Sequence, residues 1–585
     1  MMSSQHFFAD DFIQHFAFQG DSQLERQGFA GSKTPGSLPF AIEHQFLFFN
    51  PHQDNYVALQ ESGSLPWWLA DNAQIHFWRP LTTLSHWLDY QLWPDSSQLM
   101  HAHSAFIVLL AWLAFFFLYK RLLPNSAWAN IALLLLVLDV SLVLPLDWIA
   151  ARNSLLLLLI APLMLLALLR QNVLGYGIAL LCYSAALLTA EAGVSFLAFV
   201  LAYLCFLNDK SWRHKVVLFS AFLAITVLWR SYYHMQHYGA LGVGHYVDML
   251  YAPWAFIQHA LLFYPVLLVH TISGAEGVDF YLQGHWRYFV AFLGYGLLLL
   301  PISVAKRLAI ANKLWWFFYL SALLSLVPLS SIALSDPRMS ILPFAFFAPA
   351  LAMIIVAFYQ RQQALLAISI GVKSVVYLVV ACHIVISTLA LLALSLLASQ
   401  NSDAVDARFN QFDNDAEHIL IINSVDPFRL MYQPYRTAFY QQTVPASVRS
   451  LLLAQSTVHI ERLSETQYQL TQQQGMRLSV AENIAHTAKL VDGVEGMSHL
   501  LMGFFHDGSY DFYLDQIFDY AESEIRISQL VDKRPKSIIV RLKKTDITWL
   551  FWDWHSRQYQ QLPTLAVGET REIKGKHDYI KSRLF

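Results

Sequence analysis

The sequence predicts a polytopic α-helical membrane protein with a C-terminal β-rich extracytoplasmic domain. Of its 585 residues 56% are hydrophobic and only 14% are charged, whereas a soluble protein carries about 25% charged residues. The long apolar runs lie almost entirely within 101–399, and residues 400–585 have ordinary soluble composition. We therefore expect three parts: a first extracytoplasmic loop with interfacial helices at 1–100, a transmembrane bundle at 101–399 and a soluble β-rich domain at 400–585.

The first part leads into a stretch, residues 67–103, that is dense in aromatic and polar residues. Trp67, Trp68, Trp78, Trp87 and Trp93 fall within it, and indole rings are favoured at the depth of lipid headgroups. We expect this stretch to meet lipid on one side and polar groups on the other. Because no signal peptide or membrane helix precedes a loop that should be exported, we also hypothesise that the gene model lacks a first helix.

The central part contains eleven apolar segments close to the length of about 20 residues that a membrane span needs. They are residues 101–119, 127–146, 153–169, 173–190, 192–208, 215–231, 253–272, 286–304, 315–334, 340–359 and 374–398. Segment 253–272 contains two prolines and two histidines, so we predict that it is irregular, re-entrant or peripheral. About 10–11 transmembrane segments result, ten of them full crossings.

Loop charge predicts the orientation of these spans. Lysine and arginine gather in alternate loops, near 120, 170, 210–215, 306–313 and 361–373, and such loops are normally cytoplasmic. Ten crossings then place the first loop and the C-terminal domain on the same extracytoplasmic side. We expect a bacterial inner membrane. The net charge of −3 indicates no nucleic-acid partner, and the three cysteines lie in apolar segments without a disulfide or metal-ligand spacing.

Six short runs in the last part are of β-type, with partial alternation: 418–425, 456–463, 466–472, 523–530, 536–543 and 547–554. We expect a sandwich with some helix near 446–455. Asp553, His555 and Arg557 would alternate onto one face of the last strand. The domain is more suited to binding an acceptor glycan or protein than to chemistry.

Several polar residues interrupt the outer ends of the spans. The adjacent acids Asp10 and Asp11 in FFADDF could act as a base or metal ligand, or simply begin a helix. Arg79 in HFWRPL could clamp a phosphate or snorkel to the interface. Arg152 in LDWIAARNSLL could bind an anion or pair with Asp147.

Three more polar residues near the ends of the predicted spans are candidate site residues. Glu191 in LLTAEAGV is an acid between apolar runs, which is often functional, although a turn position reduces its cost. Arg338 in LSDPRMSILP could contact a lipid phosphate or pair with Asp336. His103 is a candidate substrate contact at the mouth of the bundle, and it does not share a helix face with His101. All these residues map to one side, which predicts a cavity open to the outside.

The ordered set of motifs resembles the GT-C superfamily of polytopic glycosyltransferases, and most of all the membrane half of protein O-mannosyltransferases and related uncharacterised bacterial membrane proteins. The resemblance covers roughly residues 7–350 through FFADDFIQHF, FWRPLTTLSHWLDYQLW, LDWIAARNSLL, LLTAEAGV and DPRMSILP. The chain departs from the family where Ala190 replaces a lysine and where QLMHAHS opens the next helix, and it lacks tetratricopeptide repeats.

The resemblance implies a transferase that takes a sugar from a polyprenyl-phosphate carrier and gives it to a periplasmic glycan, lipid or protein. Asp10 or Asp11 would be catalytic, Asp11 more directly, either as a base or beside a divalent cation. Arg79, Arg152 and Arg338 would contact the carrier phosphate. His103 and Glu191 are the other candidate substrate-binding residues. The alternative from another class is a lipid-linked glycan binder without catalysis, or a transporter, for which the chain shows no internal hydropathy repeat.

Overall fold

A computed structural model describes residues 7, 10–29, 37–273, 286–332, 337–360, 370–393, 416–425, 427–478 and 502–576. The chain divides into two compact units. Unit 1 comprises Met1–Asp11, Phe77–Gly239 and Val247–Asn401, and unit 2 comprises Phe12–His76, Ala240–Tyr246 and Ser402–Phe585. The predicted first loop, 1–100, therefore contributes residues to both units, and the predicted boundary near residue 400 lies outside the described residues.

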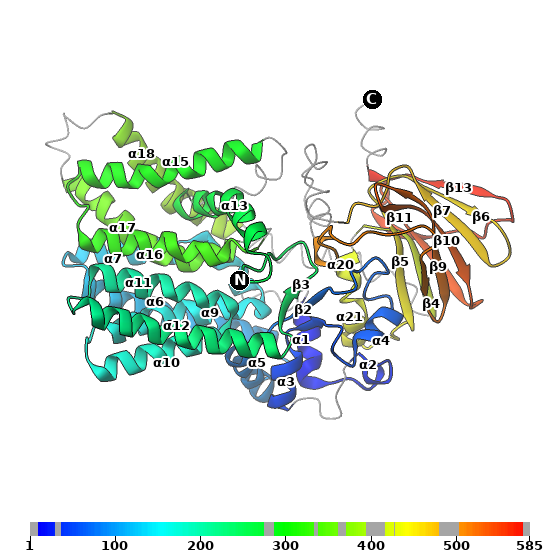
Figure 1. Ribbon diagram of the computed structural model, residues 1–585, viewed down its shortest axis with the longest axis horizontal. Helices are drawn as coiled ribbons and strands as arrows, with labels where there is room; N and C mark the ends of the chain where they lie inside the picture. Colours follow the sequence, from blue (N-terminus) through cyan, green and yellow to red (C-terminus); the bar gives the residue numbers. More distant parts are fainter. Residues whose placement is uncertain are drawn as a thin grey trace. The chain divides into compact units, whose positions relative to one another are not determined.

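Unit 1 is helical (Figure 1). Its α-helices are α5 (Pro80–Leu92), α6 (Ser97–Leu122), α7 (Ser126–Val137), α8 (Val143–Asp147), α9 (Arg152–Leu168), α10 (Val173–Thr189), α11 (Phe196–Phe206), α12 (Trp212–Met235), α13 (Pro253–Ser273), α15 (Trp286–Arg307), α16 (Lys313–Leu329), α17 (Ile341–Gln360) and α18 (Ile370–Val380). Short helical turns join or extend them: η1 (Val140–Leu142), η2 (Ile149–Ala151), η3 (Glu191–Ser195), η4 (Pro337–Ser340) and the π-helix η6 (Ala381–Ile386). Within the described residues, each of the eleven predicted apolar segments overlaps one or more of these helices.

Seven helices within the described residues are long and apolar enough to cross a membrane, or eight if the bent pair Ser126–Val137 and Val140–Asp147 forms one span. Three further apolar helices are shorter: Val173–Thr189, Glu191–Phe206 and Lys313–Leu329. Length and apolar composition thus indicate a membrane protein. The number of crossings and their orientation stay predictions.

The expected irregularity of residues 253–272 is wrong. This segment is the continuous helix α13, 21 residues long, and it is among those long enough to span a membrane. Pro265 lies inside the helix without ending it, as happens in apolar helices whose neighbours satisfy the freed backbone groups. The prolines and histidines of this segment therefore do not mark a break.

Helix α17 forms the centre of unit 1, where it packs on α7 and α16. Its side chains are buried along almost the whole length, and a helix that is apolar on every face is expected in such a position. Asparagine side chains cap the first turns of α7, α10 and α16 through Asn125, Asn172 and Asn312. These caps satisfy amide groups that a helix start would otherwise leave unpaired.

Unit 2 combines short helices with three sheets. Its helices are most of α1 (Asp10–Gln19), α2 (Ser22–Arg26), α3 (Leu38–His44), α4 (Tyr56–Glu61), α20 (Pro427–Leu430), α21 (Gln433–Phe439) and the turn η7 (Met502–Phe504). Its strands are β1 (Leu47–Phe49), β2 (Gln74–His76), β3 (Gly239–Leu241), β4 (His418–Ser424), β5 (Ser447–Leu453), β6 (Val458–Arg462), β7 (Gln467–Gln472), β8 (Ile517–Asp519), β9 (Ser523–Val531), β10 (Arg534–Leu542), β11 (Ile547–Asp553), β12 (Gln558–Gln561) and β13 (Thr570–Ile573).

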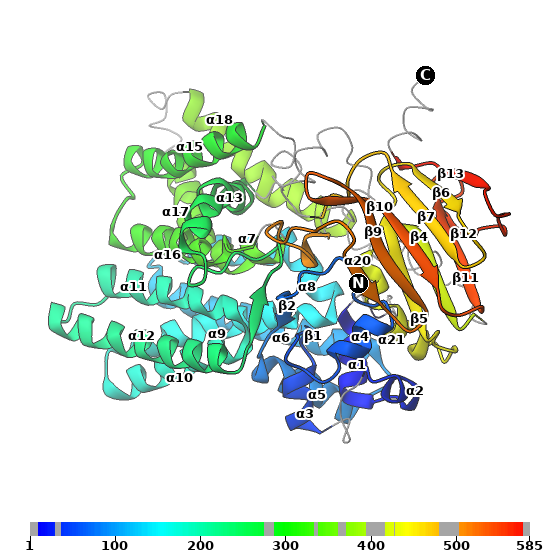
Figure 2. The same ribbon diagram turned by 45° about the vertical axis from the view of Figure 1, so that its right-hand side comes forward.

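The strands form a small sheet in the order β1-β2-β3, a six-stranded sheet in the order β13-β6-β7-β10-β9-β8 and a four-stranded sheet in the order β12-β11-β4-β5. Figure 2 shows the two larger sheets. The six-stranded sheet is antiparallel throughout, whereas β4 pairs parallel with both β5 and β11. All six predicted β-type runs are strands, and the C-terminal part is a β-sheet region.

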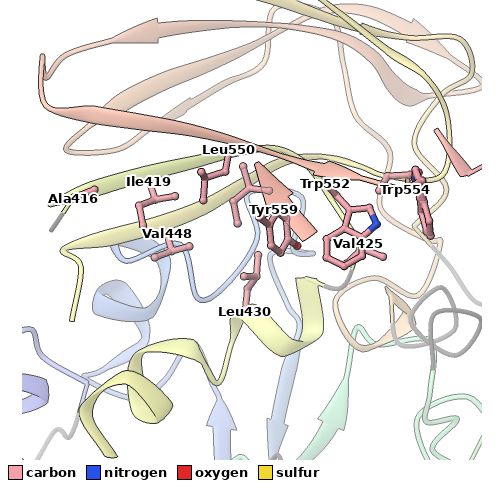
Figure 3. Packing of buried hydrophobic residues seen from close by; sticks show 11 residues of the cluster. Ala416, Ile419, Val425, Leu430, Val448, Leu550, Trp552, Trp554 and Tyr559 are labelled. Carbon is pink, nitrogen blue, oxygen red and sulfur yellow. The ribbon is translucent and has the colours of Figure 1, made fainter. Parts of the chain in front are cut away.

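The expected helix near 446–455 is wrong, because Ser447–Leu453 is strand β5. Every residue of β4 and β5 is buried, as is typical of parallel strands covered on both faces. Ile419, Val448 and Leu550 of neighbouring strands lie in one apolar cluster with Leu430 of α20 (Figure 3). A fully buried strand shows no polar alternation, so the sequence alone does not separate it from a helix.

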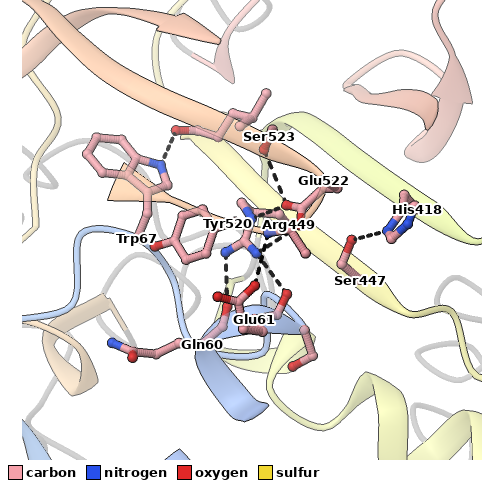
Figure 4. Close-up of polar contacts among 12 residues, drawn as sticks. Gln60, Glu61, Trp67, His418, Ser447, Arg449, Tyr520, Glu522 and Ser523 are labelled. Atoms are coloured by element: carbon pink, nitrogen blue, oxygen red, sulfur yellow. Dashed lines mark hydrogen bonds and ion pairs between the residues drawn. The ribbon is translucent and has the colours of Figure 1, made fainter. Parts of the chain in front are cut away.

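Two further expectations fail in unit 2. Strand β11 ends at Asp553, whose carboxylate accepts hydrogen bonds from the amides of His555 and Ser556, so the residues after it form a turn rather than one strand face. Trp67 and Trp68 are not headgroup anchors but core residues, 2% and 0% exposed. The Trp67 indole donates to the carbonyl of Leu451 (2.9 Å) (Figure 4).

Candidate functional site

A short segment of unit 1, residues 148–152, contacts three of the other sequence motifs. It forms the turn η2 and the start of α9. Figure 1 shows α9 close to α5 and α6. The segment has no side-chain cap of its own at Trp148 or Ala151, and amides at a helix start need partners. The side chain of Asp11, from a distant motif, provides one such partner.

Asp11 supplies the first of these contacts. Its carboxylate accepts a hydrogen bond from the Ala150 amide at 2.8 Å, and the residue is only 2% exposed. It also acts electrostatically on Arg152. A carboxylate is stabilised at a helix start by the amide groups and the helix dipole. Asp10 begins α1 and is more exposed than Asp11.

Arg152 forms the centre of the site. It is fully buried, and its Nη1 lies 2.5 Å from Oδ2 of Asp89, which is also fully buried. Its Nε donates to Ser104 (3.0 Å) and its Nη2 to the carbonyl of Met100 (2.8 Å). A buried guanidinium is costly unless it is paired and hydrogen-bonded. Arg152 meets that condition through Asp89, and the predicted alternative, pairing with Asp147, is wrong.

Asp89 connects the buried arginine to His103. Oδ1 of Asp89 lies 2.6 Å from Nδ1 of His103, whose side chain is 23% exposed. The imidazole ring also meets Trp93 edge-on, with 6.3 Å between ring centroids. The network therefore runs from a buried ion pair to a histidine that reaches the surface of unit 1.

Two more titratable side chains of α5 surround this network. Burial lowers the pKa of His86 well below its usual value, and the charge of Arg152 acts in the same direction. Burial raises the pKa of Tyr90, with Asp11 and Asp89 adding to the effect. Both side chains are thus held neutral at ordinary pH.

Arg79 and Glu191 form a second group. Arg79 precedes Pro80, the first residue of α5, and its Nη2 and Nε lie 2.6 and 3.0 Å from one oxygen of Glu191. The other oxygen of Glu191 accepts from the hydroxyl of Tyr233 at 2.5 Å. Glu191 begins η3, so this group joins the start of α5 to the turn between α10 and α11. The exposed fractions of the Arg79 and Glu191 side chains are 16% and 30%.

Arg338 also contacts the segment of residues 148–152. Its guanidinium carbon lies 4.8 Å from the centroid of the Trp148 ring, a stacking geometry that leaves the edge donors of a guanidinium directed sideways. Asp336, its predicted partner, lies outside the described residues. Arg338 is partly exposed.

The predicted site residues thus separate into two groups. Asp11, Arg152, His103 and Arg338 gather around residues 148–152, and Arg79 with Glu191 forms the other group. Asp89 and Tyr233 were not among the predicted site residues. Asp89 was recognisable as one of the polar residues in the aromatic-rich stretch before the first long apolar run, whereas nothing in the local sequence identifies Tyr233. Among the described residues, no group of three His, Cys, Asp or Glu side chains is placed to hold a metal ion.

No family model, curated protein or solved structure matches this chain.

Proposed function

We propose that this chain is a membrane glycosyltransferase that moves a sugar from a polyprenyl-phosphate carrier to an acceptor outside the cytoplasm. The observation that carries the proposal is the meeting of motif segments at residues 148–152. Asp11, Asp89 and Arg338 come from three separate stretches and contact this one segment or the arginine within it. A convergence of acids and arginines at helix ends suits a site that handles a phosphate-linked substrate.

The geometry supports a proposal of different tasks for the two acids of the first motif. Asp11 is buried and bonded to the Ala150 amide, so it would hold the start of α9 and the position of Arg152. Asp10 is the more exposed acid, and it would be the one to face an acceptor or a divalent cation. Arg338 is the arginine that we propose for contact with the carrier phosphate, because it is partly exposed and its guanidinium lies over the Trp148 ring at the start of this segment.

A binding protein without catalysis is the second candidate, and one observation favours it. Arg79 and Arg152 are each engaged by a carboxylate, Glu191 and Asp89. An arginine that is already neutralised binds a phosphate less strongly than one without an acidic partner. The binder would hold the lipid-linked glycan without releasing carrier phosphate.

Turnover separates the two candidates. The purified full chain in lipid nanodiscs is given polyprenyl-phosphate-linked hexoses, and release of polyprenyl phosphate is measured. The transferase releases it, whereas binding without release supports the second candidate. Asp11→Asn should reduce release at least about tenfold, because a neutral side chain no longer balances Arg152. Asp95→Asn, at an exposed position between α5 and α6, is the matched control and should leave release unchanged.

A further inference from the structure

We propose that His103, oriented by Asp89, is the general base that takes the proton from the acceptor; this rests on the proposed transferase function. The resemblance assigns that role to the first-motif acids. Three features of unit 1 point instead to His103: the contact that holds its Nδ1, the exposure of its ring and the burial of its partner.

The contact with Asp89 decides which ring nitrogen carries the hydrogen. Asp89 forms an ion pair with Arg152 at 2.5 Å, and a carboxylate in such a pair only accepts hydrogen bonds. Nδ1 of His103 is 2.6 Å from Asp89 but 3.4 Å from Nη1 of Arg152. The shorter contact determines which ring nitrogen is protonated. Nδ1 therefore carries the hydrogen and donates it to Asp89, and the lone pair stays on Nε2.

Nε2 is the nitrogen available for chemistry. Among the described residues it makes no hydrogen bond, and the side chain is 23% exposed while that of Asp89 is 0% exposed. A buried carboxylate that holds one nitrogen of a partly exposed imidazole is the arrangement in which histidine accepts protons in many hydrolases and transferases.

The surrounding charges support a transient imidazolium. Asp89 stabilises the positive charge that the ring gains, and Arg152 opposes it across 3.4 Å. The other titratable neighbours are His86 of α5 and His101 of α6. His86 is buried, and burial holds its pKa well below the usual value, so it adds no positive charge. His101 contacts the carbonyl of Leu146 instead.

The proposed step balances as follows. The acceptor hydroxyl gives its proton to Nε2 of His103, and its oxygen forms a bond to the anomeric carbon of the sugar. The bond from that carbon to the carrier phosphate oxygen breaks, and its electron pair leaves with the polyprenyl phosphate. The phosphate gains one negative charge as His103 gains one positive charge, and the proton then passes to solvent.

The test is the pH profile of polyprenyl phosphate release. For wild-type protein kcat/KM should fall on the acidic side, where the base is protonated. His103→Gln should lower kcat by about 10²–10⁴-fold, abolish that acidic fall and leave the affinity for the lipid-linked donor within about threefold. His101→Gln is the matched control, two residues away and bonded to a backbone carbonyl, and it should keep the acidic fall.

The outcomes distinguish the two proposals. A wild-type protein that releases no polyprenyl phosphate from any donor overturns the transferase function and the base together. An active wild type whose His103→Gln variant keeps its rate and its acidic fall overturns only the assignment of His103. A variant that loses donor affinity along with rate overturns it too, because that loss indicates a binding role. Thermal denaturation of each variant verifies that it is folded.

Discussion

Each unit of this protein contains a fully buried arginine paired with a fully buried carboxylate. In unit 1 Arg152 lies 2.5 Å from Asp89, and in unit 2 Arg449 lies 2.5 Å from Glu522, with all four side chains 0% exposed. The two pairs are alike in geometry and burial. They differ in what the carboxylate contacts on its far side, and that difference separates a structural pair from a candidate site.

The pair in unit 2 is closed. Arg449 also donates to the carbonyls of Gln60 and Glu61, and its guanidinium carbon lies 3.3 Å from the centroid of the Tyr520 ring (Figure 4). Glu522 accepts from the hydroxyl of Ser523, its neighbour in the chain. Beyond the ion pair itself, these contacts lead to backbone carbonyls, an aromatic ring and a neutral hydroxyl. This pair joins β5 to the segment before β9 and to the end of α4.

In unit 1, by contrast, the carboxylate of the pair also contacts a partly exposed side chain. Asp89 contacts His103, whose imidazole ring is partly exposed. Burial of an ion pair is therefore a poor indicator of function by itself, since structural networks also bury charges. The informative observation is a connection from the buried pair to an accessible titratable group.

The largest expected effect is the loss of the closed pair. Arg449→Met leaves Glu522 buried without its counter-charge, and we expect a loss of about 3–5 kcal/mol in the stability of unit 2. Hydrogen exchange of the β5 and β9 amides in the full chain measures this loss. A change below about 1 kcal/mol would show that the pair does not hold these elements together.

Replacing both members of each buried ion pair tests the difference between the two units. Arg449→Met combined with Glu522→Leu removes both charges and should recover most of the lost stability. Arg152→Met combined with Asp89→Leu should likewise recover the stability of unit 1 but not the release of polyprenyl phosphate. Equal behaviour of the two double variants in both measurements would remove the distinction drawn between the pairs.

An intermediate effect is expected on acidification. Burial lowers the pKa of His76, in β2 of unit 2, from 6.5 to about 4. The unfolded chain therefore binds a proton at a higher pH than the folded chain does, and folding stability falls as the pH drops from 6.5 towards 4. The full contribution is about 3 kcal/mol.

Variants of unit 2 check this contribution. His76→Gln can still donate to the carbonyl of Glu43, which the His76 ring contacts at 2.8 Å, and it should flatten the fall in stability between pH 6.5 and 4. His52→Gln, at an exposed position, should leave the fall unchanged. Hydrogen exchange of β1 and β2 across this pH range provides the measurement, and an unchanged slope in His76→Gln contradicts the assignment.

The smallest effect is expected at the partly exposed pair of unit 1. Glu191→Gln keeps a partner for the Tyr233 hydroxyl but removes the charge opposite Arg79, and it should cost about 1 kcal/mol or less. The shift in the midpoint of thermal denaturation measures this cost. Glu524→Gln in the exposed pair with Arg541 of unit 2 is the control. A donor affinity that rises in Glu191→Gln would support Arg79 as a phosphate contact that Glu191 competes for.

Much of the secondary structure was predictable because it depends on local patterns. Within the described residues the eleven apolar segments are largely helical, since an α-helix satisfies the backbone of an apolar run internally, and the six β-type runs are strands. The prediction was wrong where the local pattern does not distinguish the alternatives. Strand β5 is buried on both faces, so its sequence resembles that of a helix segment. Helix α13 continues through Pro265, which the sequence suggested as a break.

The sequence by itself determined the class of residue at each candidate position: acids and arginines at helix ends, where apolar surroundings make them conspicuous. The tertiary structure alone decided their partners. Arg152 pairs with Asp89 rather than with nearby Asp147, and Trp67 is a core residue of unit 2. The physical reason is that the burial of a side chain and the choice of its partner depend on which distant segments pack together. The periodicity of a helix or strand depends only on residues that are neighbours in the sequence.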